Sequence, residues 1–145
     1  MNVEIINKKR RIEIYGFSGT AVHKDYAGTA FKLMDIMWQT VKINDLKNKG
    51  INIWVYDTNE KVFAGVELYD SPDQNTGLEQ KVVELNNYAY YNHIGPYHLI
   101  KQAGQYMRDE LKNMGFETCL PYVEIYGHWT NDETKLETEL LMALK

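Results

Sequence analysis

The same order of hydrophobic patterns occurs twice along this chain, and this order limits the fold more than any other feature. Each half begins with a segment in which apolar and polar residues alternate, continues with apolar residues at helical spacing, and ends with two further strand-like segments. Alternation is typical of β-strands, whereas helical spacing indicates an amphipathic helix. The sequence therefore predicts an α+β fold made of a duplicated strand-helix-strand-strand unit.

The first repeat is expected within residues 1–70. Its expected elements are a strand at residues 11–23, a helix at 27–49 that ends at Gly50, and a hairpin of strands at 51–57 and 61–69. A glycine suits the left-handed residue at which many helices end. The residues between the two hairpin strands, which include Asp57 and Asn59, favour a tight turn.

The second repeat follows a connector at residues 70–80, where turn formers replace any apolar pattern. This repeat is expected within residues 81–145. Its expected elements are a strand at 81–93, a helix that starts at Pro96 and ends at Gly115, and hairpin strands at 121–128 and 135–144. The two repeats together predict an antiparallel sheet with two main helices.

A short local match supports the duplication. Residues 45–50 resemble residues 110–115 in type and order, although the capping chemistry of helix ends alone could produce such a match. Aligning Tyr56 with Tyr126 places Trp54 opposite Glu124. If a pseudo-twofold axis relates the repeats, their central hairpins lie side by side and share one surface.

The composition excludes several classes of protein. With 145 residues, of which 44% are hydrophobic and 25% charged, the chain is expected to form one globular domain. The net charge of −4 argues against binding to a nucleic-acid backbone, which relies on Lys and Arg. The sequence contains neither an apolar membrane span nor a signal peptide, and its single cysteine, Cys119, cannot form an internal disulfide. These features predict a cytoplasmic protein without membrane contact.

Strand alternation gathers one acidic and several aromatic side chains on a shared surface. Tyr122, Glu124 and Tyr126 point to one face of their strand, and Trp54 and Tyr56 point to one face of theirs. A carboxylate among aromatic rings suits a flat, lipophilic cation. Desolvation could instead make Glu124 a general acid or base with a tyrosine as proton partner. The structural alternative is a solvated or Lys-paired Glu124 with tyrosines that only pack.

A second aromatic-rich segment spans residues 88–98, where a strand runs into a helix start. We interpret it as a wall of the same pocket, with Tyr88 and Tyr91 as candidate ligand-binding residues. Ordinary capping explains the helix start, so no phosphate site is expected there. The four histidines lack the spacing of metal ligands, and Cys119 has no basic partner nearby in the sequence. We therefore expect no metal and no cofactor.

The order and spacing of these motifs resemble the GyrI-like (gyrase-inhibitor-like) small-molecule-binding domain. This domain is also the effector-binding part of AraC-type and MerR-type multidrug regulators, and here it would stand alone. The residues that carry the resemblance are Tyr88-Ala89, His93 with Gly95-Pro96-Tyr97, Leu111 to Gly115, Pro121-Tyr-Val-Glu-Ile-Tyr126, and Glu137 to Leu140.

The resemblance implies a groove at the pseudo-twofold axis between the repeats that binds lipophilic and often cationic aromatic molecules, with Glu124 as its electrostatic centre. The candidate ligand-binding residues are Trp54, Tyr56, Tyr88, Tyr91, Tyr122, Glu124 and Tyr126. Some stand-alone members resemble hydrolases that open the strained ring of cyclopropanoid genotoxins. In that alternative Glu124 would activate water, and a tyrosine such as Tyr126 or Tyr88 would donate a proton.

A third function implied by the resemblance is inhibition of DNA gyrase through protein contact. The two repeats occupy the whole length, which leaves no room for a helix-turn-helix reader, so no direct DNA binding is expected. The sequence leaves the natural ligand and the oligomeric state open.

Overall fold

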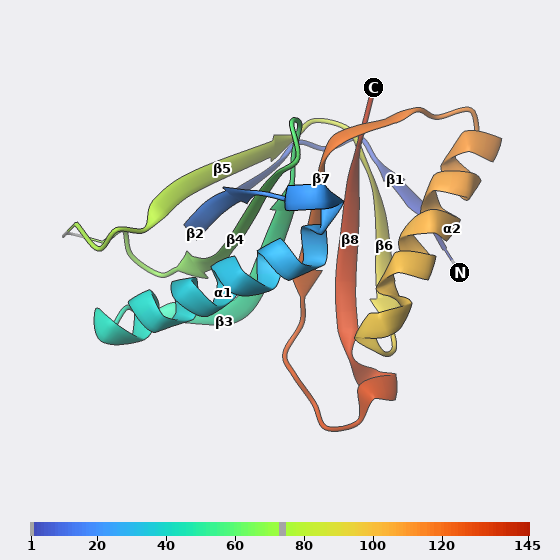
Figure 1. The fold of residues 1–145 in the computed structure, drawn as a ribbon. Coiled ribbons are helices and arrows are strands. Elements are labelled where there is room, and N and C mark those ends of the chain that lie inside the picture. Colours follow the sequence, from blue (N-terminus) through green and yellow to red (C-terminus); the bar gives the residue numbers. More distant parts are fainter. Residues whose placement is uncertain (1, 73–74) are drawn as a thin grey trace.

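The computed structural model describes residues 2–72 and 75–145, which form two helices packed on one curved antiparallel sheet (Figure 1). The helices are α1 (Tyr26–Ile43) and α2 (Ile100–Asn113), with short 3₁₀ turns at Val22–Lys24, Tyr97–Leu99 and Glu133–Lys135. The strands are β1 (Glu4–Ile6), β2 (Arg10–Thr20), β3 (Asn48–Tyr56), β4 (Lys61–Leu68), β5 (Glu79–Leu85), β6 (Tyr88–Ile94), β7 (Thr118–Tyr126) and β8 (Glu137–Leu144). The predicted α+β class and both predicted hairpins are confirmed.

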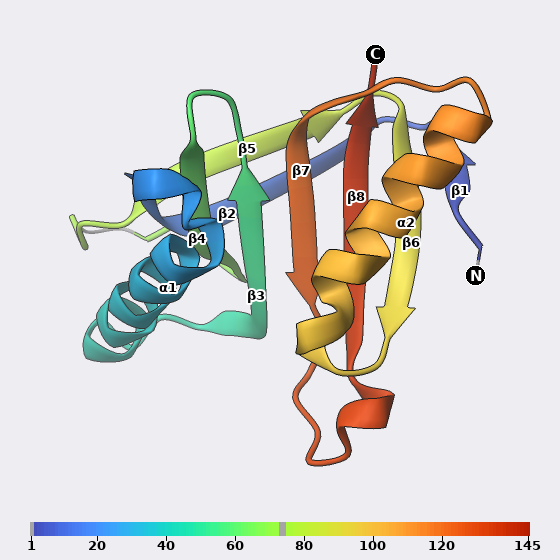
Figure 2. The same cartoon turned by 45° about the vertical axis from the view of Figure 1, so that its right-hand side comes forward.

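The order of strands across the sheet reflects the repeat. The order is β1-β6-β8-β7-β3-β4-β2-β5, so β3 and β7 meet at the centre and each half mirrors the other. The first repeat supplies β2, α1, β3 and β4, and the second supplies β6, α2, β7 and β8 (Figure 2). The two outer strands are exchanged between the halves of the sheet. Strand β1 precedes the first repeat in the chain but pairs with β6 of the second, and β5 precedes the second repeat but pairs with β2 of the first.

The predicted helix at residues 27–49 is wrong at its C-terminal end. Helix α1 ends at Ile43, because Asn44 caps it and Asp45 has a left-handed φ of 48°. The chain is already in β3 at Gly50, whose φ of +72° lies where the pairing of β3 with β4 shifts register. Gly50 therefore belongs to a strand irregularity and not to a helix stop.

The single strand expected at residues 81–93 is also wrong, because Asn86 and Asn87 divide it into β5 and β6. The two pieces pair with different halves of the sheet. Val83 and Leu85 before the break and Tyr88 after it all face the same core cluster, so the alternation changes phase there. Alternation did not reveal this change, because Ala89 and Tyr91 make the other face of β6 apolar as well.

The local match between residues 45–50 and 110–115 does not align equivalent positions. The backbone N–H of Leu46 donates to the Val41 carbonyl, and that of Phe116 donates to the Leu111 carbonyl. Leu46 therefore corresponds to Phe116. These two residues are as far apart in the sequence as Trp54 and Glu124 are, so both pairs follow the same alignment of the repeats.

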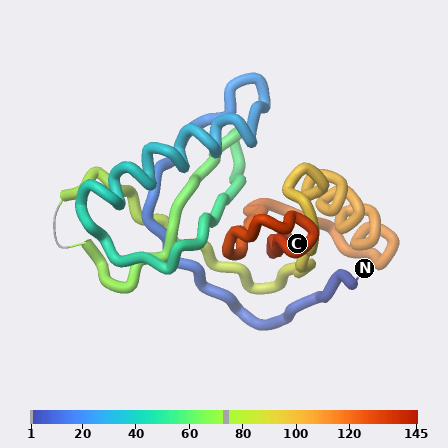
Figure 3. Tube along the Cα trace, turned by 90° about the horizontal axis from the view of Figure 1, so that it is seen from below, coloured from blue at the N-terminus to red at the C-terminus, as the bar shows by residue number. Residues whose placement is uncertain are grey.

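Both helices pack on the same face of the sheet but on different halves of it (Figure 3). Met37 and Val41 of α1 pack against Val66 of β4, whereas Met107 and Leu111 of α2 belong to the cluster under the second half. A further apolar cluster fills the face that the helices do not cover. No helix among the described residues is both long and apolar enough to cross a membrane. The central strands β3 and β7 lie between the two helices.

One glycine in β2 is required by a close backbone approach. Gly16 pairs with Gly65, and a Cβ atom at Gly16 would collide with the Ala64 carbonyl oxygen. Gly16→Ala is therefore expected to lower the free energy of unfolding by about 3 kcal/mol, measured by urea denaturation. Gly19→Ala in the same strand is the control, because its Cβ would meet Leu33 at an ordinary 3.4 Å. Equal stability of the two variants would contradict this prediction.

Candidate functional site

A cavity of about 840 Å³ lies between α1 and α2, over the central strands β3 and β7. Its lining comes from both helices and the 3₁₀ turns that precede them, from β3 and β7, and from the loops after these two strands. The lining residues are Lys24, Asp25, Tyr26, Ala27, Phe31, Met34, Gly50, Asn52, Trp54, Tyr56, Asp57, Tyr97, Ile100, Lys101, Gly104, Arg108, Leu120, Tyr122, Glu124, Tyr126, Gly127 and Trp129. The two repeats thus contribute to one shared cavity.

Strand pairing places the central residues of this cavity. In the register of β3 with β7, Trp54 lies opposite Glu124 and Tyr56 lies opposite Tyr122. Alternation directs these side chains to the helix-bearing face, while Val55 and its neighbours enter the core on the other face. The floor of the cavity therefore forms where the two repeats meet.

Glu124 is a buried carboxylate held by three tyrosine hydroxyl groups. Only 6% of the surface of this residue is exposed to solvent. The Oε1 atom accepts hydrogen bonds from Tyr126 at 2.6 Å and from Tyr56 at 3.1 Å, and the Oε2 atom accepts one from Tyr122 at 2.7 Å. No Lys or Arg among the described residues lies within 4.0 Å of this carboxylate. Within the described part of the chain, Glu124 therefore has hydrogen-bond donors but no positively charged side chain within 4.0 Å.

The three tyrosines are held in their neutral form. Burial raises the pKa of Tyr56, Tyr122 and Tyr126, and the negative charge of Glu124 raises each pKa further. Each hydroxyl group therefore stays protonated and continues to donate to Glu124 well above neutral pH.

Aromatic rings surround this polar cluster. Trp54 packs edge-on against Tyr126, with ring centroids 4.8 Å apart, and Phe31 of α1 packs edge-on against Trp54 at 5.1 Å. Tyr56 and Tyr122 stack at 5.6 Å. The Trp54 indole N–H is buried and has no hydrogen-bond partner among the described residues. The cavity thus offers aromatic faces and edges around a single acidic group.

Five of the seven candidate residues from the sequence come together here: Trp54, Tyr56, Tyr122, Glu124 and Tyr126. Tyr88 and Tyr91 do not line the cavity. Strand β8 separates β6 from β7, and Tyr88 points into the core on the opposite face. Tyr91 faces the α2 side but packs in the cluster beneath that helix.

Sequence reasoning missed the residues that the helices and one loop bring to the cavity. Phe31 and Gly104 lie on helices that pack on different sheet halves, and Trp129 lies in the loop after β7. Helical periodicity marked the faces of α1 and α2 that pack on the sheet, but it carries no information about the distance between the two helices.

The tyrosine cluster predicts a loss of stability at alkaline pH. The folded state keeps three protons that the unfolded chain releases above the ordinary tyrosine pKa of 10.0, so stability is complete below pH 10 and falls as the pH rises beyond it. Urea denaturation at a series of pH values is expected to show this fall. Tyr126→Phe should make the fall shallower, whereas Tyr69→Phe, at an exposed position, should leave its slope unchanged. Equal slopes in all three proteins would contradict the prediction.

Comparisons with known proteins place this arrangement among similar folds. No family model matches the sequence, and no curated protein matches it. The structure is similar to the EcmrR C-terminal domain, with 16% identity, coverage of 100% of this chain and 99% of that chain, and a TM-score of 0.76. It is also similar to SAV2435 bound to tetraphenylphosphonium, with 16% identity, coverage of 100% and 94%, and a TM-score of 0.64.

Two further comparisons concern a larger protein and an enzyme. The chain spans 57% of EcmrR in its complex with DNA, with 14% identity, coverage of 99% of this chain, and a TM-score of 0.73. A hydrolase from Listeria innocua is 12% identical, with coverage of 96% of this chain and 92% of that chain, and a TM-score of 0.54. The chain has the GyrI-like fold, as the resemblance in its sequence implied.

Proposed function

We propose that this protein binds lipophilic aromatic cations in the cavity between α1 and α2, with Glu124 as the counter-charge. The observation that carries the proposal is the buried Glu124 carboxylate, which accepts three tyrosine hydrogen bonds but has no cationic partner within 4.0 Å among the described residues. A buried charge is costly unless an opposite charge balances it. A cationic ligand would supply that balance.

The walls of the cavity support the same ligand class. The cavity volume of about 840 Å³ lies within the range of small-molecule sites. Aromatic rings attract a cation over their faces and cover apolar substituents. SAV2435, which shares the fold, has been observed with the lipophilic cation tetraphenylphosphonium. That compound is therefore a suitable probe for this chain.

The test is a tryptophan-fluorescence titration with tetraphenylphosphonium and with tetraphenylborate, which has the same shape and the opposite charge. Trp54 and Trp129 both line the cavity and should report an occupant. Saturable binding of the cation, at least about 100-fold tighter than that of the anion, is expected. Equal binding of the two probes, or no binding of the cation, would contradict the proposal.

Hydrolysis is the second candidate function. It is favoured by the 2.6 Å hydrogen bond from the Tyr126 hydroxyl to Glu124 inside the cavity, which pairs a base with a proton donor. Glu124 would take a proton from water as the water oxygen bonds to a cyclopropane carbon. The ring carbon–carbon bond would break toward a conjugated carbonyl oxygen, which would receive a proton from Tyr126. Glu124 would then pass the proton taken from water to the Tyr126 oxygen across their hydrogen bond, which restores both groups.

Mass spectrometry tests this candidate, because the product of a cyclopropanoid substrate gains the mass of one water. Loss of turnover in both Glu124→Gln and Tyr126→Phe would support it, and undiminished turnover in either variant would reject these roles. Contact with gyrase stays a prediction from the resemblance, and a supercoiling assay would test it.

A further inference from the structure

The two walls of the cavity differ in charge. On the α1 side, Lys24 is followed by Asp25, and the carboxylate of Asp57 pairs with Lys81 at 3.5 Å. On the α2 side, the cavity is lined by Lys101 and Arg108 and by no acidic residue of that helix. The positive charge is therefore concentrated along α2.

The two cations lie on the same face of α2, toward the cavity. Lys101, Gly104 and Arg108 are three and then four residues apart, which places them on one face of α2, with about 10 Å of helix axis between the two cations. Gly104 lies between them and has no side chain. A Cβ atom added there would lie 3.5 Å from Arg108 Nη1, 3.8 Å from the Tyr122 hydroxyl oxygen and 3.9 Å from Met142 Cε, so the Arg108 guanidinium lies over Gly104 and beside Tyr122.

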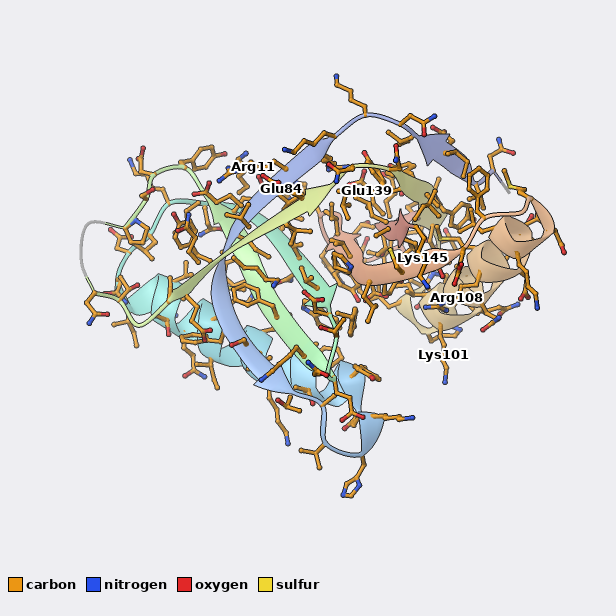
Figure 4. The ribbon with its side chains drawn as sticks, turned by 90° about the horizontal axis from the view of Figure 1, so that it is seen from above. Arg11, Glu84, Lys101, Arg108, Glu139 and Lys145 are labelled. Atoms are coloured by element: carbon orange, nitrogen blue, oxygen red, sulfur yellow. The ribbon has the colours of Figure 1, made fainter. Side chains whose placement is uncertain are left out.

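Neither cation is neutralised by a neighbour. Within residues 2–72 and 75–145, Lys101 and Arg108 form no ion pair within 4.0 Å. Figure 4 shows both on α2, with Lys101 projecting away from the ribbon. The Arg108 guanidinium lies 5.7 Å from the centre of the Tyr122 ring, and the hydroxyl group of that ring donates to Glu124. The cavity therefore has a carboxylate at its floor and two cations at its α2 edge, with an aromatic ring between them.

A ligand with a single positive charge would satisfy only the floor of this cavity and would be repelled by its α2 edge. Resting on the proposed function, we propose that the preferred ligands are zwitterionic. A lipophilic cation lies against Glu124, and an anionic group on the same molecule lies at the α2 edge of the cavity and contacts Lys101 and Arg108. Lys101 and Arg108 each offer several N–H donors, which suit a carboxylate or a group of the same charge. Both side chains are exposed, so the anion can reach them.

The test compares two probes that differ in one charge, (4-carboxybutyl)triphenylphosphonium and its methyl ester, by titration calorimetry. The carboxylate probe is expected to bind about five- to tenfold more tightly than the ester, since the interacting cations are exposed. This preference should shrink as salt is added. The double variant Lys101→Gln, Arg108→Gln should lose the preference by weakening binding of the carboxylate probe.

Lys112→Gln is the matched control, because Lys112 lies on α2 but does not line the cavity. This variant should keep the preference for the carboxylate probe. Equal affinities of the wild-type protein for the two probes would overturn the inference while leaving the proposed function intact. The inference would also be overturned if the double variant bound the ester more tightly and the carboxylate probe no less tightly than the wild-type protein does. Lys101 and Arg108 would then only repel the phosphonium group. Absence of binding by both probes would overturn the proposed function and this inference together.

Discussion

Glu124→Gln is expected to weaken binding of tetraphenylphosphonium by at least about 30-fold, equivalent to about 2 kcal/mol. The amide oxygen can still accept from Tyr56 and Tyr126, and the amide nitrogen can donate to the Tyr122 hydroxyl oxygen, so the hydrogen-bonded cluster is kept while the negative charge is lost. Titration calorimetry measures the change directly. Because the variant leaves the aromatic walls in place, the loss isolates the contribution of charge from that of apolar contact.

Glu139→Gln provides a matched control. Glu139, which is labelled in Figure 4, accepts a hydrogen bond from the Tyr90 hydroxyl at 2.7 Å, much as Glu124 accepts from its tyrosines. Glu139 does not line the cavity. Its replacement changes the net charge equally and should alter the affinity by less than about twofold. Similar losses in the two variants would mean that overall charge, and not the charge at the cavity floor, determines binding.

Gly104→Phe is expected to weaken binding of tetraphenylphosphonium by at least about 100-fold, because Gly104 lines the cavity and a phenyl ring there would occupy space that the ligand needs. Gly104→Ala is the control. Its Cβ would meet neighbours only at ordinary contact distances, and alanine favours the helix by about 1 kcal/mol over glycine. The alanine variant should therefore bind normally and unfold at a higher urea concentration.

Thermal unfolding and circular dichroism of both Gly104 variants would establish that they are folded. A folded Gly104→Phe protein with undiminished affinity would place the ligand outside the cavity between α1 and α2.

The floor of the cavity could be predicted from the sequence because it depends on local rules. Alternation fixes which residues of a strand share a face, and the repeat predicts that the two central hairpins meet. From these two rules, five side chains are predicted to share one surface: Trp54, Tyr56, Tyr122, Glu124 and Tyr126. The hydrogen bonds to Glu124 then follow from register, since Tyr122 and Tyr126 lie two residues away on the same strand.

The parts that could not be predicted depend on tertiary structure. The end of α1 at Ile43 is set by a left-handed residue, Asp45, that the sequence does not mark as a helix stop. Tyr88 resembles the cavity tyrosines in sequence, yet its strand is separated from β7 by β8, so it contributes to the core instead. The exchange of β1 and β5 between the two halves of the sheet carries no local signal.

The most direct test of the central claim is a crystal structure of this protein with tetraphenylphosphonium. The account predicts phosphorus within about 6 Å of the Glu124 carboxylate, with phenyl groups against Trp54 and the stacked pair Tyr56 and Tyr122. An occupied site elsewhere on the protein, with an empty cavity between α1 and α2, would contradict the claim that Glu124 is the counter-charge for the ligand.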